Sequence, residues 1–208
     1  MDMEYDTLMN RMPIKCVKQG EEKMNAIHFI REYIRHPRSV GAVIPSSRQL
    51  AKQITTPISF DEASCIIEYG AGTGVFTQEL ISNKRPETLL LVIEANESFY
   101  KTLQSKYGHL ERVHIIHGSA EHVAQYMHQY EVSKVDYIVS GLPFTSLPAA
   151  LSSLILGQTA EVLGQEGKFI TFQYSKVKHN FFRTFFADIQ IKKVHYNVPP
   201  AYVFTCSL

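Results

Sequence analysis

Apolar residues in this chain fall into short continuous runs separated by longer segments of mixed polarity. The runs are typical of buried strands and lie at residues 65–69, 88–93, 113–116, 135–139 and 168–172. The segments between them are long enough for helices and lie at 75–83, 97–107, 120–130 and 147–163. Because strand and helix alternate through five units, the pattern predicts a parallel sheet covered by helices on both faces.

Two more strands are predicted near the end of the chain, at 190–196 and 201–207. The link between them contains Asn197-Val198-Pro199-Pro200 and is too short for a helical crossover, so the two strands are expected to pair antiparallel. The predicted fold is therefore α/β and Rossmann-like. Its seven-stranded sheet is mostly parallel and has an antiparallel last strand.

The hydrophobic pattern predicts no strand in the part of the chain that precedes residue 61. Residues 1–23 show no periodicity and are expected to form a flexible tail. Residues 24–60 are expected to form a helical extension, because apolar side chains recur at helical spacing over 24–35 and Ser46-Ser47 is typical of the N-cap of a second helix. Residues 61–208 then make up the sheet-containing domain.

Composition and charge narrow the class of protein. The 208 residues are 45% hydrophobic, and no apolar run reaches the length of a membrane span. Three cysteines without a C-x-x-C pair, and no secretory signal, favour reduced thiols in the cytoplasm. Residues 11–48 and 168–195 each carry a net charge of +5, which indicates an anionic partner or only solvated lysine faces.

A glycine-rich segment, Glu68-Tyr69-Gly70-Ala71-Gly72-Thr73-Gly74, lies between the first predicted strand and the following helix. Dinucleotide-binding loops would have a third glycine where this chain has Val75. The G-x-G-x-G order with an acid on the strand suits S-adenosylmethionine, which has no pyrophosphate. Glu94 ends the second strand and is placed to accept hydrogen bonds from the ribose hydroxyls. The cofactor-binding candidates are Glu68, Gly70, Gly72, Gly74 and Glu94, against the alternative of a chance glycine loop.

The end of the fourth strand, Ser140-Gly141-Leu142-Pro143-Phe144, resembles a motif of class I methyltransferases. Ligands of such sheets bind outside the carboxyl ends of the strands. In the rRNA adenine N6-dimethyltransferases the motif reads Asn-Leu-Pro-Tyr, and its asparagine accepts a hydrogen bond from the target amine. Gly141 replaces that asparagine here, so this chain lacks the hydrogen-bond acceptor with which those enzymes recognise adenine.

Bacterial phospholipid N-methyltransferases, which methylate phosphatidylethanolamine, resemble the chain more closely over residues 27–207. The shared motifs run from Phe29 to Arg48 and from Glu68 to Gly74, followed by Ser140-Gly141-Leu142-Pro143 with Leu147-Pro148, and then by Phe172-Gln173-Tyr174 and Asn197-Val198-Pro199-Pro200-Ala201. The family's tyrosine-glycine-proline after the fifth strand is not kept, because Ser175 and Lys176 follow Tyr174. The resemblance implies further cofactor contacts at Ser119, Ala120, Glu121 and Ser140; Ser119, where relatives have an aspartate, is alternatively an N-cap.

Methyl transfer to a lipid amine, together with the position of residues at the ends of the strands, predicts how substrate is bound. Phe144, Tyr174 and the backbone at Leu142 are expected to stabilise the positive charge that moves to the amine, unless the two rings only pack in the core. A phosphodiester head group is expected to contact His36, Arg38, Lys178, His179 and Arg183. For Lys178, His179 and Arg183 the alternative is a solvated loop without a ligand.

These features predict a partner for the protein and leave two alternative functions open. The expected partner is a phospholipid membrane surface at the inner face of the cell membrane, contacted by the helix at 24–35, which alternatively serves as a lid. Nucleic acid is not expected as a partner, and the nine histidines show no metal-ligand spacing. The rival functions are an RNA adenine methyltransferase and a non-catalytic membrane- or nucleic-acid-binding module of the same fold.

Overall fold

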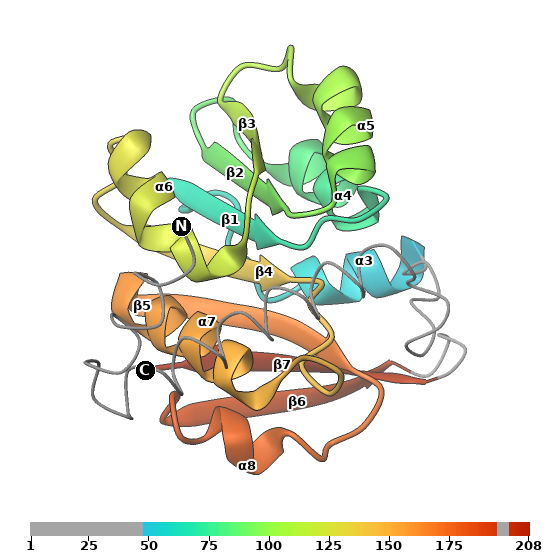
Figure 1. Cartoon of the computed structure of the whole chain (residues 1–208), viewed down its shortest axis with the longest axis vertical. Helices are drawn as coiled ribbons and strands as arrows, with labels where there is room; N and C mark the ends of the chain where they lie inside the picture. Colours follow the sequence, from blue (N-terminus) through green and yellow to red (C-terminus); the bar gives the residue numbers. More distant parts are fainter. Residues whose placement is uncertain (1–47, 195–199) are drawn as a thin grey trace, which may run out of the picture.

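The sheet of the computed structural model, which describes residues 48–194 and 200–208, has seven strands in the order β3-β2-β1-β4-β5-β7-β6 (Figure 1). The first five strands are parallel, and β7 runs antiparallel to both β5 and β6. This confirms the predicted Rossmann-like fold. The strands are β1 (Cys65–Tyr69), β2 (Leu89–Glu94), β3 (Val113–His117), β4 (Val135–Ser140), β5 (Leu163–Gln173), β6 (Asp188–Val194) and β7 (Ala201–Ser207).

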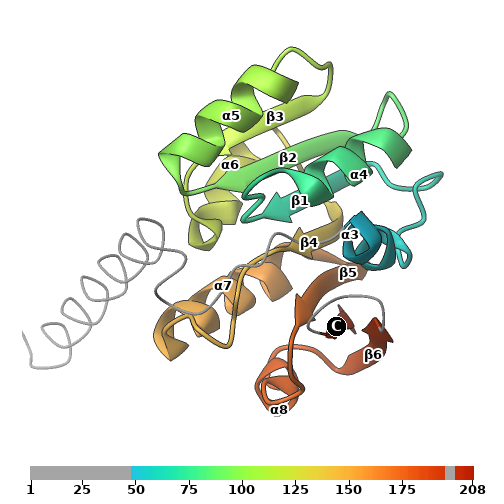
Figure 2. The ribbon, with the colours of Figure 1, turned by 90° about the vertical axis from the view of Figure 1, so that its right-hand side faces the viewer.

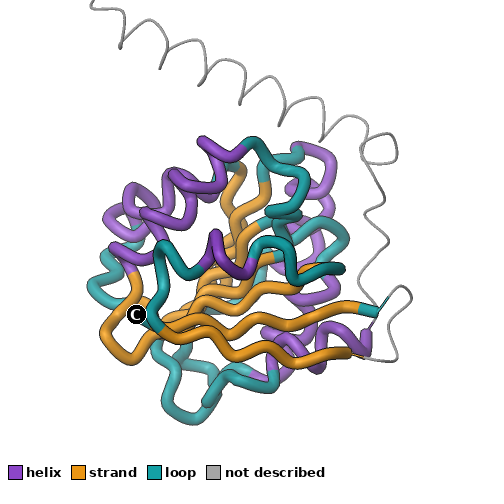
Figure 3. The backbone as a smooth tube through the Cα atoms, turned by 90° about the horizontal axis from the view of Figure 1, so that it is seen from below, coloured by secondary structure: helices purple, strands orange, loops and turns teal. Residues whose placement is uncertain are grey.

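Helices cover both faces of the sheet (Figure 2). One face is covered by α3 (Arg48–Thr55), α4 (Val75–Asn83) and α5 (Glu97–Tyr107). The other face is covered by the 3-10 turn η1 (Ala120–His122), α6 (Val123–Gln129), α7 (Ala149–Val162) and α8 (His179–Phe182). Seen from below, the strands run side by side between these two layers (Figure 3).

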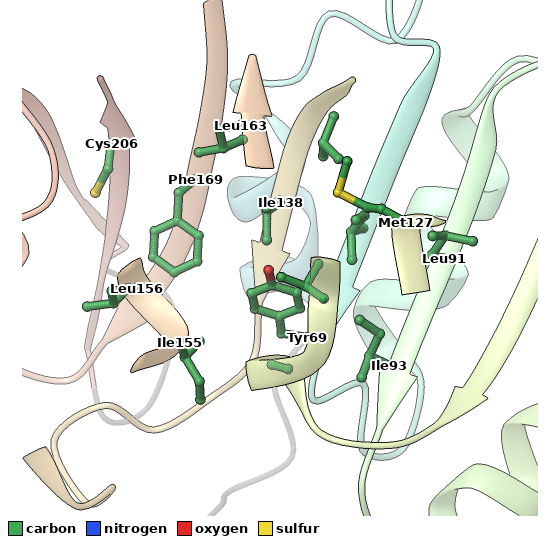
Figure 4. Packing of buried hydrophobic residues seen from close by; sticks show 14 of the residues in the cluster. Tyr69, Leu91, Ile93, Met127, Ile138, Ile155, Leu156, Leu163, Phe169 and Cys206 are labelled. Atoms are coloured by element: carbon green, nitrogen blue, oxygen red, sulfur yellow. The ribbon is translucent and has the colours of Figure 1, made fainter. Parts of the chain in front are cut away.

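Two hydrophobic clusters, one on each face, hold the layers together. Figure 4 shows the cluster under α6 and α7, where the fully buried Tyr69 ring lies among side chains such as Ile93 and Ile138. On the other face, α3 contributes the buried side chains of Leu50, Ala51 and Ile54. Burying a large aliphatic side chain stabilises a fold by about 1.5–3 kcal/mol. The described part of the predicted extension is therefore packed into the core.

Both cysteines in the described ranges, Cys65 and Cys206, are buried free thiols. Burial raises the pKa of each thiol to about 12, so both are protonated at neutral pH. The predicted tail at 1–23, the helix at 24–35 and Cys16 lie outside the described residues.

Candidate active site

The turns after β1, β3 and β4 meet at one edge of the sheet. The Gly70 N–H donates to the Ile93 carbonyl at 2.8 Å, and the Gly141 N–H donates to the Tyr69 carbonyl, also at 2.8 Å. The Gly118 N–H donates to the Glu94 carbonyl at 3.1 Å. The glycine loop, the end of β2 and the Gly141 turn, which the sequence assigned to one site, therefore lie together at the carboxyl ends of the parallel strands.

The glycine loop uses a backbone conformation that favours glycine. Gly70, Gly72 and Gly74 all have positive φ, at 66°, 55° and 81°. A Cβ on Gly70 would lie 2.7 Å from Cδ2 of Leu142, whereas a Cβ on Gly72 would meet nothing within 4 Å. The middle of the loop therefore borders open space, and its backbone is accessible to a ligand.

Glu94 connects β2 to this loop. Its Oε2 accepts the Gly72 N–H at 2.7 Å, and its Oε1 accepts the Asn96 N–H at 2.8 Å. Burial raises the pKa of Glu94, and these backbone hydrogen bonds oppose the shift. A carboxylate oxygen accepts more than one hydrogen bond. Glu94 therefore holds the loop and keeps acceptor capacity for a pair of ribose hydroxyls.

Glu68 is the second buried carboxyl group near the loop, and it lies against Thr77 of α4. Neither of its oxygens has a hydrogen-bond partner of good geometry in the part of the chain that the structure describes. Burial raises the pKa of Glu68 to about 8, and the neighbouring Glu94 adds to the shift. A buried acid that is held only by its weak contacts with Thr77, next to an open loop, fits a ligand that carries positive charge, as S-adenosylmethionine does.

The turn after β3 holds Ser119, Ala120 and Glu121. Ser119 occupies the N-cap position of η1, but its side chain makes no capping hydrogen bond. The hydroxyl of Tyr126, from α6, fills the space in which a Cβ on Gly118 would lie. Sequence analysis missed Tyr126, because only the glycine at 118 signals that a side chain from another element approaches there.

The turn after β4 is close to the glycine loop. A Cβ on Gly141 would lie 2.6 Å from the Gly70 carbonyl oxygen, so this backbone leaves no room for a side chain. Within the turn, the Leu142 N–H donates to Ser140 Oγ at 3.2 Å, and the Leu142 carbonyl accepts the Phe144 N–H at 3.1 Å. The predicted residues Ser140 and Leu142 therefore shape a turn that packs against the loop.

The two predicted aromatic residues lie in different surroundings. The Phe144 ring is fully buried and packs edge-on against Phe169 and Phe182, with ring centroids 6.0 and 5.5 Å apart. It therefore belongs to the core, which is the packing alternative for this residue. The Tyr174 ring is 36% exposed.

Tyr174 is linked to the helix that follows the glycine loop. Its ring packs edge-on against Phe172 at 5.6 Å, and Phe172 packs against Phe76 of α4 at 5.7 Å. Tyr174 thus presents an exposed aromatic face at the same edge of the sheet.

The predicted head-group residues are only partly described. Lys178, His179 and Arg183 lie on the loop after β5 and on or next to α8, while His36 and Arg38 lie outside the described residues. Within 48–194 and 200–208 no three metal-ligating side chains lie together. No helix in these ranges is long and apolar enough to cross a bilayer.

Strand order, the G-x-G-x-G loop and the acid at the end of β2 define a class I S-adenosylmethionine-dependent methyltransferase. The profile of the family described as ribosomal RNA adenine dimethylase matches residues 38–192, and the chain belongs to this family. The protein is therefore an enzyme that transfers methyl groups.

Individual relatives cover most of the chain. It is 27% identical over 180 residues to an ornithine lipid N-methyltransferase of Singulisphaera acidiphila, covering 86% of this chain and 93% of that one. A precorrin-6y methyltransferase of Geobacter metallireducens superposes with a TM-score of 0.63 at 13% identity, covering 79% of this chain and 90% of that one. A 16S rRNA methyltransferase of Thermus thermophilus, in complex with AdoMet and guanosine, gives 0.59 at 18% identity, over 82% and 44%. The two solved structures support the fold.

Proposed function

We propose that the protein transfers a methyl group from S-adenosylmethionine to the head-group amine of a membrane lipid, with phosphatidylethanolamine as the acceptor. The observation that carries this proposal is the similarity to a lipid N-methyltransferase over nearly the whole length of both chains. The motifs that resemble phospholipid N-methyltransferases support the choice of phosphatidylethanolamine. We further propose that the enzyme works at the cytoplasmic face of the cell membrane as a peripheral protein.

The geometry at Gly141 argues against RNA adenine as the acceptor. In the adenine dimethyltransferases an asparagine at this position would bind the target amine. Here a side chain at 141 would run into the Gly70 carbonyl at 2.6 Å. A primary amine on a flexible head group does not need an asparagine at this position, because contacts with the rest of the lipid position the amine.

One group of residues at this edge of the sheet would bind the cofactor. The glycine loop and Glu94 would hold the ribose and the amino-acid part of the cofactor, and Glu68 would face its positive charge. Ser119, Ala120 and Glu121 would border the adenine. When bound, S-adenosylmethionine supplies an electrophilic methyl group on its sulfonium centre.

The remaining residues would act on the acceptor. The amine would react in line as the free base: its nitrogen would bond to the methyl carbon while the carbon–sulfur bond breaks, so that a neutral thioether leaves and positive charge develops on the nitrogen. The exposed ring of Tyr174 and the backbone carbonyl of Leu142 would stabilise this charge. Lys178, His179 and Arg183 would bind the phosphodiester, together with His36 and Arg38. Holding the two reactants in line supplies much of the acceleration.

The test uses the purified full-length chain with S-adenosylmethionine labelled in its methyl group. Vesicles containing phosphatidylethanolamine, vesicles containing ornithine lipid and unmodified rRNA are offered in separate reactions. We expect label in phosphatidylethanolamine. Label in ornithine lipid alone would overturn the particular acceptor and keep lipid N-methylation, whereas label in RNA alone would overturn lipid methylation. Binding of S-adenosylmethionine without transfer to any lipid would also contradict the proposal.

A further inference from the structure

The loop that joins β5 to α8 carries an unusually exposed apolar side chain. We define the β5–α8 loop as residues 174–178. Val177 in this loop is 81% exposed, more than any other large apolar side chain in the described residues. In Figure 1 the chain leaves β5 at its right-hand end and passes below β6 to α8. A single exposed valine is ordinary on a protein surface, so its meaning depends on what surrounds it.

The surroundings of Val177 are basic. The sequence contains no acidic residue from 167 to 187. Lys193 at the end of β6 pairs with Tyr202, which in turn pairs with Gln173 immediately before the β5–α8 loop. The cations placed at this edge are therefore Lys176 and Lys178 in the β5–α8 loop and Lys193 on β6. Within the described part of the chain, none of these cations forms an ion pair.

Aromatic rings hold the two lysines that flank Val177. The ammonium group of Lys176 lies 5.2 Å from the centre of the Tyr202 ring, and that of Lys178 lies 4.8 Å from the centre of the Phe181 ring. Such contacts fix a cation without neutralising its charge. The two lysines next to Val177 in the sequence are thus held against rings and keep their positive charges.

The β5–α8 loop also begins at the candidate active site. Tyr174, its first residue, is linked through Phe172 and Phe76 to the helix that follows the glycine loop. A surface bound by this loop would therefore lie next to the place where the acceptor amine enters.

We propose that the β5–α8 loop is a membrane-docking element, which inserts Val177 into the head-group boundary of a bilayer that contains anionic phospholipids. Lys176 and Lys193 bind the phosphates around the insertion point. A bilayer explains both features, because an apolar side chain gains burial there and cations gain anionic partners. A nucleic acid backbone would satisfy the lysines alone. The proposal rests on lipid methylation as the function.

The test compares two apolar-to-acid exchanges in the full chain. Val177→Asp is expected to lower partitioning onto phosphatidylcholine vesicles with added phosphatidylglycerol at least tenfold. The matched control, Leu154→Asp, changes a 41% exposed apolar side chain on α7 and is expected to leave partitioning unchanged. Equal thermal unfolding of the variants shows that folding is intact. Wild-type partitioning by Val177→Asp, or equal losses in both variants, would overturn the proposal.

A second pair of variants tests the charge. Lys176→Gln combined with Lys193→Gln is expected to reduce partitioning by about fivefold per lysine and to weaken its dependence on salt. Lys168→Gln, at the middle of the same β5 strand, is the control and should have little effect. If the double variant loses affinity for rRNA fragments but not for vesicles, the loop binds nucleic acid and the proposal is wrong.

Turnover separates the failure of docking from the failure of lipid methylation. On a short-chain phosphatidylethanolamine that stays monomeric in water, Val177→Asp is expected to work at the wild-type rate, while on vesicles it is expected to be slow. If the wild type methylates neither form, the proposed function fails. If both proteins methylate vesicles equally fast, docking through the β5–α8 loop fails and lipid methylation stands.

Discussion

Glu68 and Glu94 are neighbouring buried acids with different tasks. Glu94 accepts two backbone hydrogen bonds, which favour its charged form, whereas Glu68 accepts none of good geometry from the described residues. Burial raises the pKa of both groups, and that of Glu68 reaches about 8. The backbone hydrogen bonds to Glu94 favour the charged form that organises the loop. Glu68, with a pKa of about 8, is largely protonated at neutral pH, and binding of a cationic ligand would favour loss of its proton to solvent.

Replacing Glu94 tests the first of these tasks. Glu94→Ala removes the acceptor for Gly72 and for the ribose, so it is expected to weaken S-adenosylmethionine binding at least tenfold, or about 1.4 kcal/mol. Isothermal titration calorimetry measures the affinity. Glu97→Ala, on the exposed first turn of α5, is the control and should bind as the wild type does. Unchanged affinity in Glu94→Ala would mean that the cofactor binds elsewhere.

Glu68 predicts a pH dependence of stability. Its pKa is raised from 4.5 to about 8, so the folded state keeps a proton that the unfolded chain has lost between these values. This contribution to the free energy of unfolding therefore falls as pH rises from about 5 to 8, by at most about 1.4 kcal/mol per pH unit. Glu68→Gln does not titrate, so its stability relative to the wild type is expected to increase over that range.

Urea unfolding at several pH values measures the difference between Glu68→Gln and the wild type. Glu166→Gln, an exposed position on β5, is the control, and its stability profile should run parallel to that of the wild type. A parallel profile for Glu68→Gln as well would show that Glu68 is ionised in the folded protein.

For single residues, the sequence predicts the position in the fold correctly where that position depends only on the residue's own strand. Glu94 is an example, because the end of a parallel strand determines which edge it occupies. The prediction fails for Phe144, whose burial depends on Phe182 of a helix 38 positions later. Tyr126 was missed for the same reason, since its contact at Gly118 comes from another element.

At the scale of elements, continuous apolar runs predict their strands well. The predicted bounds match those of β1, α4, α5 and β7. β5 begins five residues earlier than the predicted 168, because Gln165 and Glu166 are exposed and interrupt the apolar run. α8 has only four residues, which is too short to show a helical period, although its Phe182 is fully buried. Exposed strand ends and single helical turns depend on tertiary packing, which the hydrophobic pattern does not record.

Because the turns after β1 and β4 are in contact, a substitution at Gly141 tests whether the packing of these two turns maintains the cofactor site. Gly141→Asn recreates the adenine-reading motif but places a Cβ 2.6 Å from the Gly70 carbonyl. We expect the glycine loop to be displaced, with weaker S-adenosylmethionine binding, a lower unfolding temperature and no gain of RNA methylation. Calorimetry, thermal unfolding and the labelled-RNA assay measure the three outcomes.

Gly157→Ala in α7 is the matched control for Gly141→Asn. Its added Cβ would meet nothing within 4 Å, so the helix should gain about 0.5–1 kcal/mol. If Gly141→Asn binds cofactor normally and methylates adenine in RNA, the turn is more adaptable than its packing indicates, and the argument against an RNA substrate fails.

At the scale of the whole molecule, charge is gathered in two basic regions of the sequence. The region at 168–195 carries a net charge of +5 and supplies the cations around the β5–α8 loop. The other region, at 11–48, contains the predicted amphipathic helix at 24–35, which lies outside the described residues. If both regions contact one membrane, binding of the first raises the effective concentration of the second at the surface.

This arrangement predicts how variants in the two regions combine. Ile27→Asp with Ile30→Asp is expected to lower vesicle binding and to spare S-adenosylmethionine affinity, as Val177→Asp is. If the two regions bind the surface independently once the protein is docked, their free-energy losses add, so the combined variant should lose the product of the separate fold-changes. Vesicle sedimentation measures all three proteins. A combined loss no larger than one of the single losses would mean that only one region contacts the bilayer. Lost cofactor affinity in the Ile27/Ile30 variant would instead support the helix as a lid over the active site.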